Sequence, residues 1–340
     1  MEKILKAFSY PPAILNFAFE RFVSTSSNPI WRISSLSHNS RPIPPIKLAG
    51  SDSSTSIDEF WSSNTVYNPA VRTALQSRMN IEWRFRTHPL FRELTGLYGD
   101  HTGEVILDYG CGPGNDVAGF TAHSRAQKII GMDISAKALH IAAHRAALHN
   151  PEPGRVEFVQ ISDSSPTIPL TENSVDFISS QGVLMHTSDP VAILKEFYRV
   201  LKPGGRACIM VYSQPSIWYN LFTAYEQMIV NDSFPDMNLD EAFTGNTDGR
   251  DCPMSRCFPT EQFSEMCESA GFACDFVGGY LTQAEMFSLR RFGRAALNDA
   301  RLDEGHKEFL RSLTFDKRGL PLFKGRHAGV SGVYQLSKQA

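Results

Sequence analysis

The chain has 340 residues, a formal net charge of −3 and 42% hydrophobic residues. This near-neutral charge gives no general reason to expect nucleic acid or an anionic membrane as a partner. No stretch of about eighteen apolar residues predicts a membrane-spanning helix. The six cysteines follow no zinc-binding spacing, so we expect reduced thiols in a cytoplasmic protein. Length alone suggests roughly two domains, but one α/β domain with insertions fits as well.

The first 55 residues differ in composition from the rest of the chain. Residues 1–50 contain six basic residues but only two acids, and the stretch from Ser24 to Pro45 is rich in serine and proline. We expect residues 1–55 to form an arm that is either poorly ordered or packed on the body of the protein. A transit peptide is the alternative interpretation of this stretch.

Residues 56–100 show a helical pattern rich in aromatic side chains, among them Trp61 and Tyr67. Pro89 suits the first turn of a helix, where a missing backbone N–H costs nothing. We therefore expect a helical cap over residues 56–100.

A strand followed by closely spaced glycines comes next. Val105 to Leu107 form an apolar run typical of a strand buried on both faces of a parallel sheet. Asp108 ends this run, and Gly110, Gly112 and Gly114 follow it. Glycine permits positive φ and lets a ligand approach the backbone closely. A strand that leads through such a turn into a helix predicts the nucleotide-binding crevice of an open α/β sheet.

The charge beside this turn separates two classes of cofactor. A dinucleotide site has the spacing Gly-x-Gly-x-x-Gly and places a pyrophosphate at the start of the helix. Here the spacing is Gly-x-Gly-x-Gly, and Asp108 precedes the first glycine by two residues. A carboxylate repels a pyrophosphate and attracts an ammonium group. The turn therefore favours a ligand with a cationic end, such as the methionine part of S-adenosylmethionine (SAM).

Two further acids follow predicted strands. Asp133 closes the second strand, Lys128 to Met132, and stands 19 residues beyond Gly114. An open α/β sheet places the carboxylate that binds ribose hydroxyls at this position. The third strand, Val156 to Ile161, is followed by Asp163 in a serine-rich loop.

The fourth strand, reached through Ser174 to Ile178, is followed by a predicted loop from Ser179 to His186. A helix then leads to Glu196–Gly205, Glu-Phe-Tyr-Arg-Val-Leu-Lys-Pro-Gly-Gly, where Gly204 and Gly205 are expected to stop it before a fifth strand. Together with the glycine turn, this phrase resembles the class I SAM-dependent methyltransferases. The ubiquinone- and menaquinone-biosynthesis-like branch is closest in style.

The resemblance implies an α/β Rossmann-like open sheet of seven strands in the order 3-2-1-4-5-7-6, with the last strand antiparallel. The methyltransferase domain is then expected over 101–340, with a lid insertion at about 213–258 and a basic helical insertion at about 280–327. The lid would follow a strand on the edge of the sheet where ligands bind.

The resemblance also assigns the cofactor, S-adenosyl-L-methionine, to specific positions. Ile134 would pack on adenine, and Asp163 would bind the adenine amino group. The full set of expected cofactor-binding residues is Asp108, Gly110, Cys111, Gly112, Gly114, Asp133, Ile134, Asp163, Ser164 and Gln181.

The candidate catalytic residues are His186 and Tyr212. His186 lies in the loop after the fourth strand, near where the methyl group should point, and Tyr212 ends the fifth strand. Either could remove a proton from an acceptor hydroxyl, although His186 could equally be a loop histidine that bonds a carbonyl. No Asp/Glu/His cluster in the sequence suggests a metal, so no metal ion is expected.

The cap, the lid and the basic insertion supply the candidate substrate contacts. In the family that this sequence resembles, N-terminal helices cover the cofactor and wall off the substrate. We therefore name Trp61, Tyr67, His88 and Trp218. Arg290 and Arg291 would bind an anionic group of the acceptor, and the alternative is that they belong to a solvated helical insertion.

The expected function is transfer of a methyl group to a small molecule, with oxygen as the first choice of acceptor atom, then nitrogen, then carbon. The acceptor would be partly apolar and carry an anionic group. Two alternatives stay open: SAM-dependent chemistry without methylation, such as cyclisation or a pericyclic reaction, and a SAM-binding interaction subunit without turnover. We expect no nucleic-acid partner and no membrane span. The oligomeric state is undetermined, with a homodimer as one option.

Overall fold

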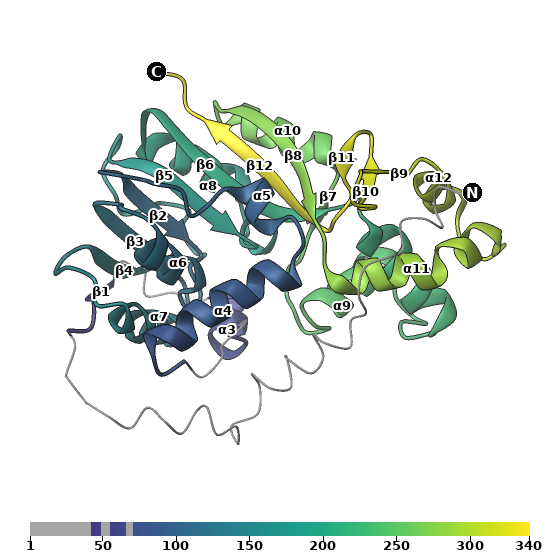
Figure 1. The fold of residues 1–340 in the computed structure, drawn as a ribbon, viewed down its shortest axis with the longest axis horizontal. Helices are drawn as coiled ribbons and strands as arrows, with labels where there is room; N and C mark the ends of the chain where they lie inside the picture. The colour runs from purple at the N-terminus through teal and green to yellow at the C-terminus, as the bar shows by residue number, and fades with distance from the viewer. Residues whose placement is uncertain (1–41, 49–54, 66–70) are drawn as a thin grey trace.

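The computed structural model describes residues 42–48, 55–65 and 71–340 (Figure 1). Among the described residues the main sheet has nine strands, and seven of them follow the predicted order 3-2-1-4-5-7-6, with the last strand antiparallel to both of its neighbours. In spatial order they are β4 (Val156–Gln160), β3 (Lys128–Asp133), β2 (Val105–Tyr109), β5 (Val175–Gln181), β6 (Leu201–Ser213), β12 (Ser331–Ser337) and β8 (Ala273–Tyr280).

Two short strands extend this sheet, so the predicted count of seven is wrong. β1 (Ile46–Leu48) pairs in parallel with β4, and β7 (Cys257–Phe258) pairs in parallel with β6. β1 comes from the expected N-terminal arm, most of which, residues 1–41 and 49–54, lies outside the described residues. Three residues at a sheet edge carry too weak an alternating pattern to be recognised in a serine- and proline-rich segment.

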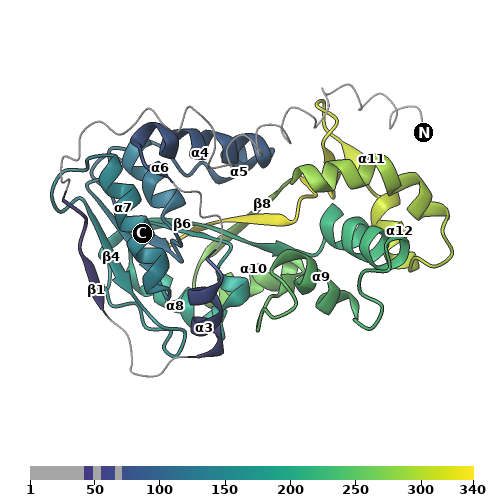
Figure 2. The same ribbon diagram turned by 90° about the horizontal axis from the view of Figure 1, so that it is seen from below.

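Helices cover both faces of the sheet (Figure 2). α6 (Asn115–His123) and α7 (Ala136–Leu148) pack against each other and against β3. α8 (Pro190–Val200) and α10 (Thr260–Ser269) pack together on the opposite face. This arrangement explains why Val105–Leu107 of β2 and Ile129–Met132 of β3 carry no charged or polar side chain, since strands covered on both faces have no solvent side.

Two predicted boundaries around the fourth and fifth strands are corrected. β5 continues to Gln181, so the loop expected from Ser179 is shorter and contains the 3₁₀ turn η2 (Leu184–His186). α8 ends at Val200, before Gly204 and Gly205, because Leu201 is already extended and pairs with Val175 of β5. Tertiary pairing thus ends the helix earlier than the glycines would.

The helical cap is formed by α3 (Ser56–Ser63), α4 (Ala74–Thr87) and α5 (Phe91–Thr95). α3 and α4 each begin with a capping box, made by Thr55 with Asp58 and by Thr73 with Gln76. α4 packs against α6 and α7, close to the end of the glycine turn, whereas α5 packs against β8 and β12.

The lid and the second insertion gather at one end of the sheet (Figures 1 and 2). The lid contains η3, a π-helix (Trp218–Val230), and α9 (Leu239–Thr247), while the insertion contains α11 (Gln283–Asn298) and α12 (Glu304–Arg311). These helices share a second apolar core around Leu221, Tyr225 and Phe309. The sequence predicts a helical insertion at about 280–327, and the structure differs from this prediction. The insertion also contains a three-stranded sheet of β9 (Thr314–Phe315), β10 (Pro321–Phe323) and β11 (Arg326–His327).

One buried carboxylate joins the lid to the insertion and to the last strand. Glu285 of α11 is fully buried and accepts hydrogen bonds from the backbone N–H groups of Trp218 (3.1 Å) and Val330 (2.8 Å). Its other oxygen accepts from the backbone N–H of Thr282, at 2.7 Å. Burial raises the pKa of Glu285 to about 7 despite these donors.

Glu285 should make stability depend on pH. Because its folded-state pKa is raised from 4.5 to about 7, its contribution is full below pH 4.5 and is lost as the pH rises through 7. The loss amounts to about 3 kcal/mol in the free energy of unfolding. Urea unfolding at pH 5 and pH 8 should show this decrease in the wild type and in the exposed control Glu308→Gln, and not in Glu285→Gln. An unchanged decrease in Glu285→Gln would refute the assignment.

Candidate functional site

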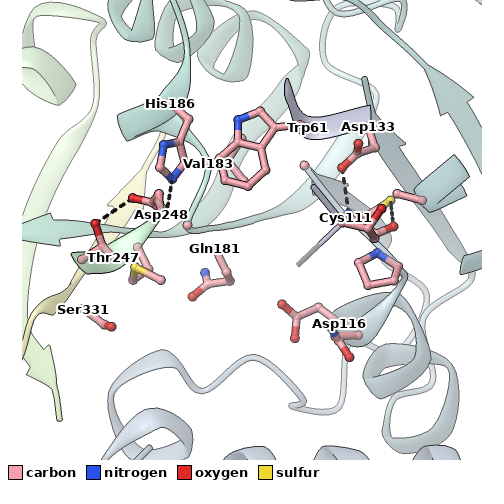
Figure 3. Close-up of a pocket in the computed structure, with 18 of the residues that line it drawn as sticks. Trp61, Cys111, Asp116, Asp133, Gln181, Val183, His186, Thr247, Asp248 and Ser331 are labelled. Carbon is pink, nitrogen blue, oxygen red and sulfur yellow. Dashed lines mark hydrogen bonds and ion pairs between the residues drawn. The ribbon is translucent and has the colours of Figure 1, made fainter. Parts of the chain in front are cut away.

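A cavity of about 570 Å³ lies at the carboxyl ends of the central parallel strands. The glycine turn lines one side, the η2 turn and the end of α9 line the other, and the cap helices α3 and α4 contribute side chains to its wall. In Figure 3, Cys111 and Asp133 face His186 and Asp248 across this space, with Gln181 between them. Most of the candidate cofactor residues and both candidate catalytic residues line this cavity, whereas Asp108, Gly114 and Ser164 are not part of its wall.

Two features shape the glycine turn: the close contacts of its backbone with neighbouring residues and the positive φ angles of its glycines. The backbone N–H groups of Gly110 and Cys111 both donate to the carbonyl of Met132 at 2.8 Å, which fixes the turn against β3. At Gly110, with φ +73°, a Cβ would lie 2.3 Å from Val183. Gly112 differs, because with φ +51° its missing Cβ would point into open space. Gly112 thus leaves room for a ligand.

Asp108 lies buried directly behind this turn. It is 2% exposed, and its Oδ2 has no hydrogen-bond partner among the described residues. Burial, reinforced by the neighbouring charge of Asp116, raises the pKa of Asp108 well above its usual value. Asp116 itself lines the cavity and is already engaged by Arg84 and Tyr98. The orphaned oxygen of Asp108 is the feature expected where a cationic group of a ligand approaches.

Asp133 is held at the end of β3 by two backbone donors. Its oxygens accept from the N–H of Gly112 and the N–H of Ser135, each at 2.8 Å. Burial raises the pKa of Asp133. Ile134 lies beside it in the cavity wall. This carboxylate therefore both orders the glycine turn and faces the space where ribose hydroxyls are expected.

The remaining expected cofactor residues differ in position. Asp163 lines the cavity and accepts from the N–H of Ser188 at 3.1 Å, whereas Ser164 is exposed and outside the wall. Gln181 lines the cavity, donates to the carbonyl of Cys208 at 2.9 Å, and has a buried Oε1 without a partner among the described residues. Burial raises the pKa of the Cys111 thiol, so this side chain is a neutral part of the wall.

His186 is a buried imidazole whose tautomer is fixed by its surroundings. Its Nδ1 lies 2.8 Å from the carbonyl oxygen of Met254, and because a carbonyl can only accept, Nδ1 carries the hydrogen. Burial lowers the pKa of His186, and the charge of Asp248 opposes this effect. The Nε2 atom of the neutral ring thus presents a lone pair, 3.7 Å from Asp248 Oδ1.

Asp248 joins the two candidate catalytic residues. The hydroxyl of Tyr212 donates to its Oδ1 at 3.0 Å, and the hydroxyls of Ser255 and Thr247 donate to its Oδ2 at 2.7 and 2.9 Å. Burial and Asp248 together raise the pKa of Tyr212 well above its usual value. Tyr212 is therefore a donor that positions Asp248, and the geometry does not favour it as a base.

The expected substrate contacts are only partly brought together. Trp61, His88 and Trp218 line the cavity, and burial lowers the pKa of His88 to about 4. Arg290 and Arg291 are exposed on α11 and are not part of the cavity wall. Tyr67 lies outside the described residues.

Asp116 and Asp248 of the cavity wall were missing from the predicted set, whereas the sequence already marks Arg84 as a polar candidate of the cap. Arg84 and Asp116 lie 32 residues apart and meet only because α4 packs on α6. Asp248 follows His186 by 62 residues, and its polar neighbours Asn246 and Thr247 are typical of a loop. The only signal for Asp248 was its place in the expected lid.

The part of the chain that the structure describes contains no helix long and apolar enough to cross a membrane.

Comparison with known proteins identifies the family. Residues 100–271, half of the chain, match the family model described as a methyltransferase domain. A demethylmenaquinone methyltransferase of Lactococcus lactis is 35% identical over 144 residues, which cover 41% of this chain and 55% of that protein. An uncharacterized methyltransferase of Schizosaccharomyces pombe is 36% identical over 30% of this chain and 38% of its own length. The chain thus spans about half the length, or less, of these curated relatives.

A solved structure, Haemonchus contortus phosphoethanolamine N-methyltransferase 2 with S-adenosyl-L-methionine, is similar at 17% identity and a TM-score of 0.47, over 84% of this chain and 60% of that one. The family match covers the glycine turn, Asp133 and the phrase ending in Gly205. The chain therefore belongs to the methyltransferase domain family of SAM-dependent enzymes, and S-adenosylmethionine is its cofactor.

Proposed function

We propose that this protein transfers a methyl group from S-adenosylmethionine to a hydroxyl oxygen of a small, partly apolar molecule. The observation that carries this proposal is the position of His186. Its Nε2 lone pair and its partner Asp248 line the same cavity as the glycine turn. Nitrogen and then carbon are the next acceptor atoms, since a neutral amine needs no base and an acidic carbon does.

The cofactor fits the residues of this chain. The orphaned carboxylate of Asp108 would accept the ammonium group, and the open side of Gly112 would admit the methionine backbone. Asp133 would bind the ribose hydroxyls, and Ile134 would cover one face of adenine. Asp163 and the free Oε1 of Gln181 are further acceptors in the cavity wall. When bound, the sulfonium supplies an electrophilic methyl group.

The chain's own contribution is alignment, exclusion of water and removal of one proton. Methyl transfer from a sulfonium consumes charge, so the closed site matters more than strong electrostatic stabilisation. Trp61, whose ring centre lies 4.8 Å from that of His186, and Trp218 of the lid would hold the acceptor and keep water out. His186 Nε2 would take the hydroxyl proton, and Asp248, held by Tyr212, would stabilise the resulting imidazolium.

The acceptor side of the cavity supports an apolar molecule more than an anionic one. The tryptophans at 61, 83 and 218 are all in its wall, whereas Arg290 and Arg291 are not. Arg84 lines the cavity but is paired with Asp116. An anionic group on the acceptor, the other expected feature, has less support from the described part of the cavity wall. Because the Lactococcus relative is named a demethylmenaquinone methyltransferase, hydroquinones are the first acceptors to test.

Release of S-adenosylhomocysteine distinguishes the proposal from its alternatives. Purified full-length protein is incubated with S-adenosylmethionine and with simple phenols, hydroquinones or aromatic amines. Acceptor-dependent release supports methyl transfer, and phenols should react best. Cofactor binding without release for every acceptor would favour non-methylating chemistry or a binding subunit.

The open side of Gly112 gives a test of cofactor placement. Gly112→Ala and Gly154→Ala both force alanine into positive φ without a clash, which costs about 1–2 kcal/mol each. Only Gly112→Ala adds a methyl group to the ligand space, so calorimetry should show weaker SAM binding for this variant alone. Equal affinities in both variants would show that no ligand approaches Gly112.

The raised pKa of Asp108 predicts pH-dependent cofactor binding. The ammonium group needs the ionised carboxylate, so SAM should bind more tightly as pH rises and should displace a proton. Titration calorimetry in buffers of different ionisation enthalpy measures that release. Asp108→Asn should bind weakly without pH dependence, while the exposed Asp100→Asn should behave as the wild type. A pH-independent affinity in the wild type would contradict this role.

His186 and Tyr212 are separated by their expected kinetic effects. His186→Gln should lower kcat by about 10²–10⁴-fold on a hydroxyl acceptor, the usual contribution of a general base. Because the pKa of His186 is lowered from 6.5, wild-type kcat/KM for the acceptor, measured at saturating SAM so that Asp108 does not contribute, should fall only below about pH 6.5, where the ring becomes protonated. Tyr212→Phe should lower kcat by less than His186→Gln does, and the exposed control His140→Gln should leave kcat unchanged. A larger loss in Tyr212→Phe than in His186→Gln would make Tyr212 the base.

A further inference from the structure

Three side chains with metal-binding atoms meet beside the cavity. They are His186 of η2, Asp248 at the end of α9 and Cys252 in the loop that follows, and one ligand atom of each lies within 4.8 Å of the other two. Cys252 is 8% exposed and His186 is 5% exposed. Imidazole, carboxylate and thiolate together are a ligand set that suits zinc.

Two acceptor atoms of this group, His186 Nε2 and Asp248 Oδ1, face each other with no hydrogen between them. The Nδ1–H of His186 donates to the Met254 carbonyl, so Nε2 is an acceptor, and it faces Asp248 Oδ1 at 3.7 Å. That distance is too long for a hydrogen bond. Asp248 Oδ2 already has two donors, from Ser255 and Thr247, whereas Oδ1 has only Tyr212 and keeps one acceptor position. A positive charge between Nε2 and Oδ1 would satisfy both.

The spacing and the surrounding contacts also suit a metal ion. Two N/O ligands on a tetrahedral zinc ion lie about 3.4 Å apart, given metal–ligand bonds of about 2.1 Å, which is close to the 3.7 Å found here. The Nδ1–H bond to a backbone carbonyl is the usual outer-shell contact of a metal-bound histidine. The Cys252 thiol lies 3.4 Å from the same Met254 carbonyl, which brings two of the ligands close together, and binding as a thiolate replaces this S–H donation with a bond to the ion.

We propose that His186, Asp248 and Cys252 bind one divalent cation of zinc-like softness. The charges balance, because loss of the thiol proton gives a carboxylate and a thiolate against the two positive charges of the ion. Because a cysteine binds a metal ion as its thiolate, binding releases the thiol proton. The ion links the lid to the η2 turn.

The effect of the ion on activity rests on the proposed function, methyl transfer to a hydroxyl oxygen. The ion and the acceptor hydroxyl require the same Nε2 lone pair of His186. Bound metal therefore withholds the base and should inhibit methyl transfer to oxygen. The metal site and the catalytic site are alternative uses of one imidazole.

Cobalt(II) is the probe, because a Co²⁺–thiolate bond gives a near-ultraviolet charge-transfer band. The full-length protein, treated with a chelator and free of cofactor, is titrated with Co²⁺ and then with Zn²⁺ as competitor. We expect this band at one equivalent of Co²⁺, with loss of the band on adding Zn²⁺. Cys252→Ser should weaken Co²⁺ binding by at least about 100-fold, beyond the 10- to 100-fold typical of outer-shell changes.

Cys257→Ser, five residues away in β7, is the matched control and should bind Co²⁺ like the wild type. Circular dichroism and thermal unfolding show whether Cys252→Ser is folded, and His186→Gln provides a second loss of a ligand. Absence of the thiolate band in the wild type, or its persistence in folded Cys252→Ser, would overturn the inference. Because this readout needs no turnover, it stands or falls separately from the methyl-transfer assay.

Discussion

A buried carboxylate that faces a turn of glycines is the constraint around which this structure is arranged. Asp108 lies at the end of β2, and its Oδ2 finds no hydrogen-bond partner among the described residues. Leaving such a group unsatisfied costs about 1–3 kcal/mol. The cost is explained if a cationic ligand completes the site. The positive φ of Gly110 lets the turn pass close to Val183, and the open side of Gly112 leaves room beside the backbone.

The other half of the site joins residues of the sheet to a residue of the insertion that follows β6: His186 follows β5, Tyr212 lies near the end of β6, and Asp248 follows α9. Asp248 reaches His186 because the lid folds over the carboxyl ends of β5 and β6. The buried carboxylate of Glu285 ties the first turn of η3 to α11 and to the segment before β12. The cavity wall is thus built from different parts of the chain, with the glycine turn on one side and the segment around Asp248 on the other.

The sequence was sufficient for the central sheet and for the cofactor. Apolar runs, the spacing of Gly110, Gly112 and Gly114, and the phrase before Gly205 are local patterns, and local patterns predict strands and turns well. The edge strand β1 was missed because its side chains are mostly exposed and its register comes from β4. Tyr212 was named as a base, but its role depends on Asp248, which is distant in sequence. Arg290 and Arg291 were chosen from charge alone, which does not say which face of a helix meets a cavity.

The central claim is that a carboxylate behind the glycine turn selects a ligand with a positively charged amino-acid end. Titration calorimetry of the full-length protein with S-adenosylmethionine and with methylthioadenosine, which lacks that end, tests it directly. A charge-assisted hydrogen bond contributes about 1.5–3 kcal/mol, so methylthioadenosine should bind at least about 10-fold more weakly. Equal affinities for the two ligands would contradict the account.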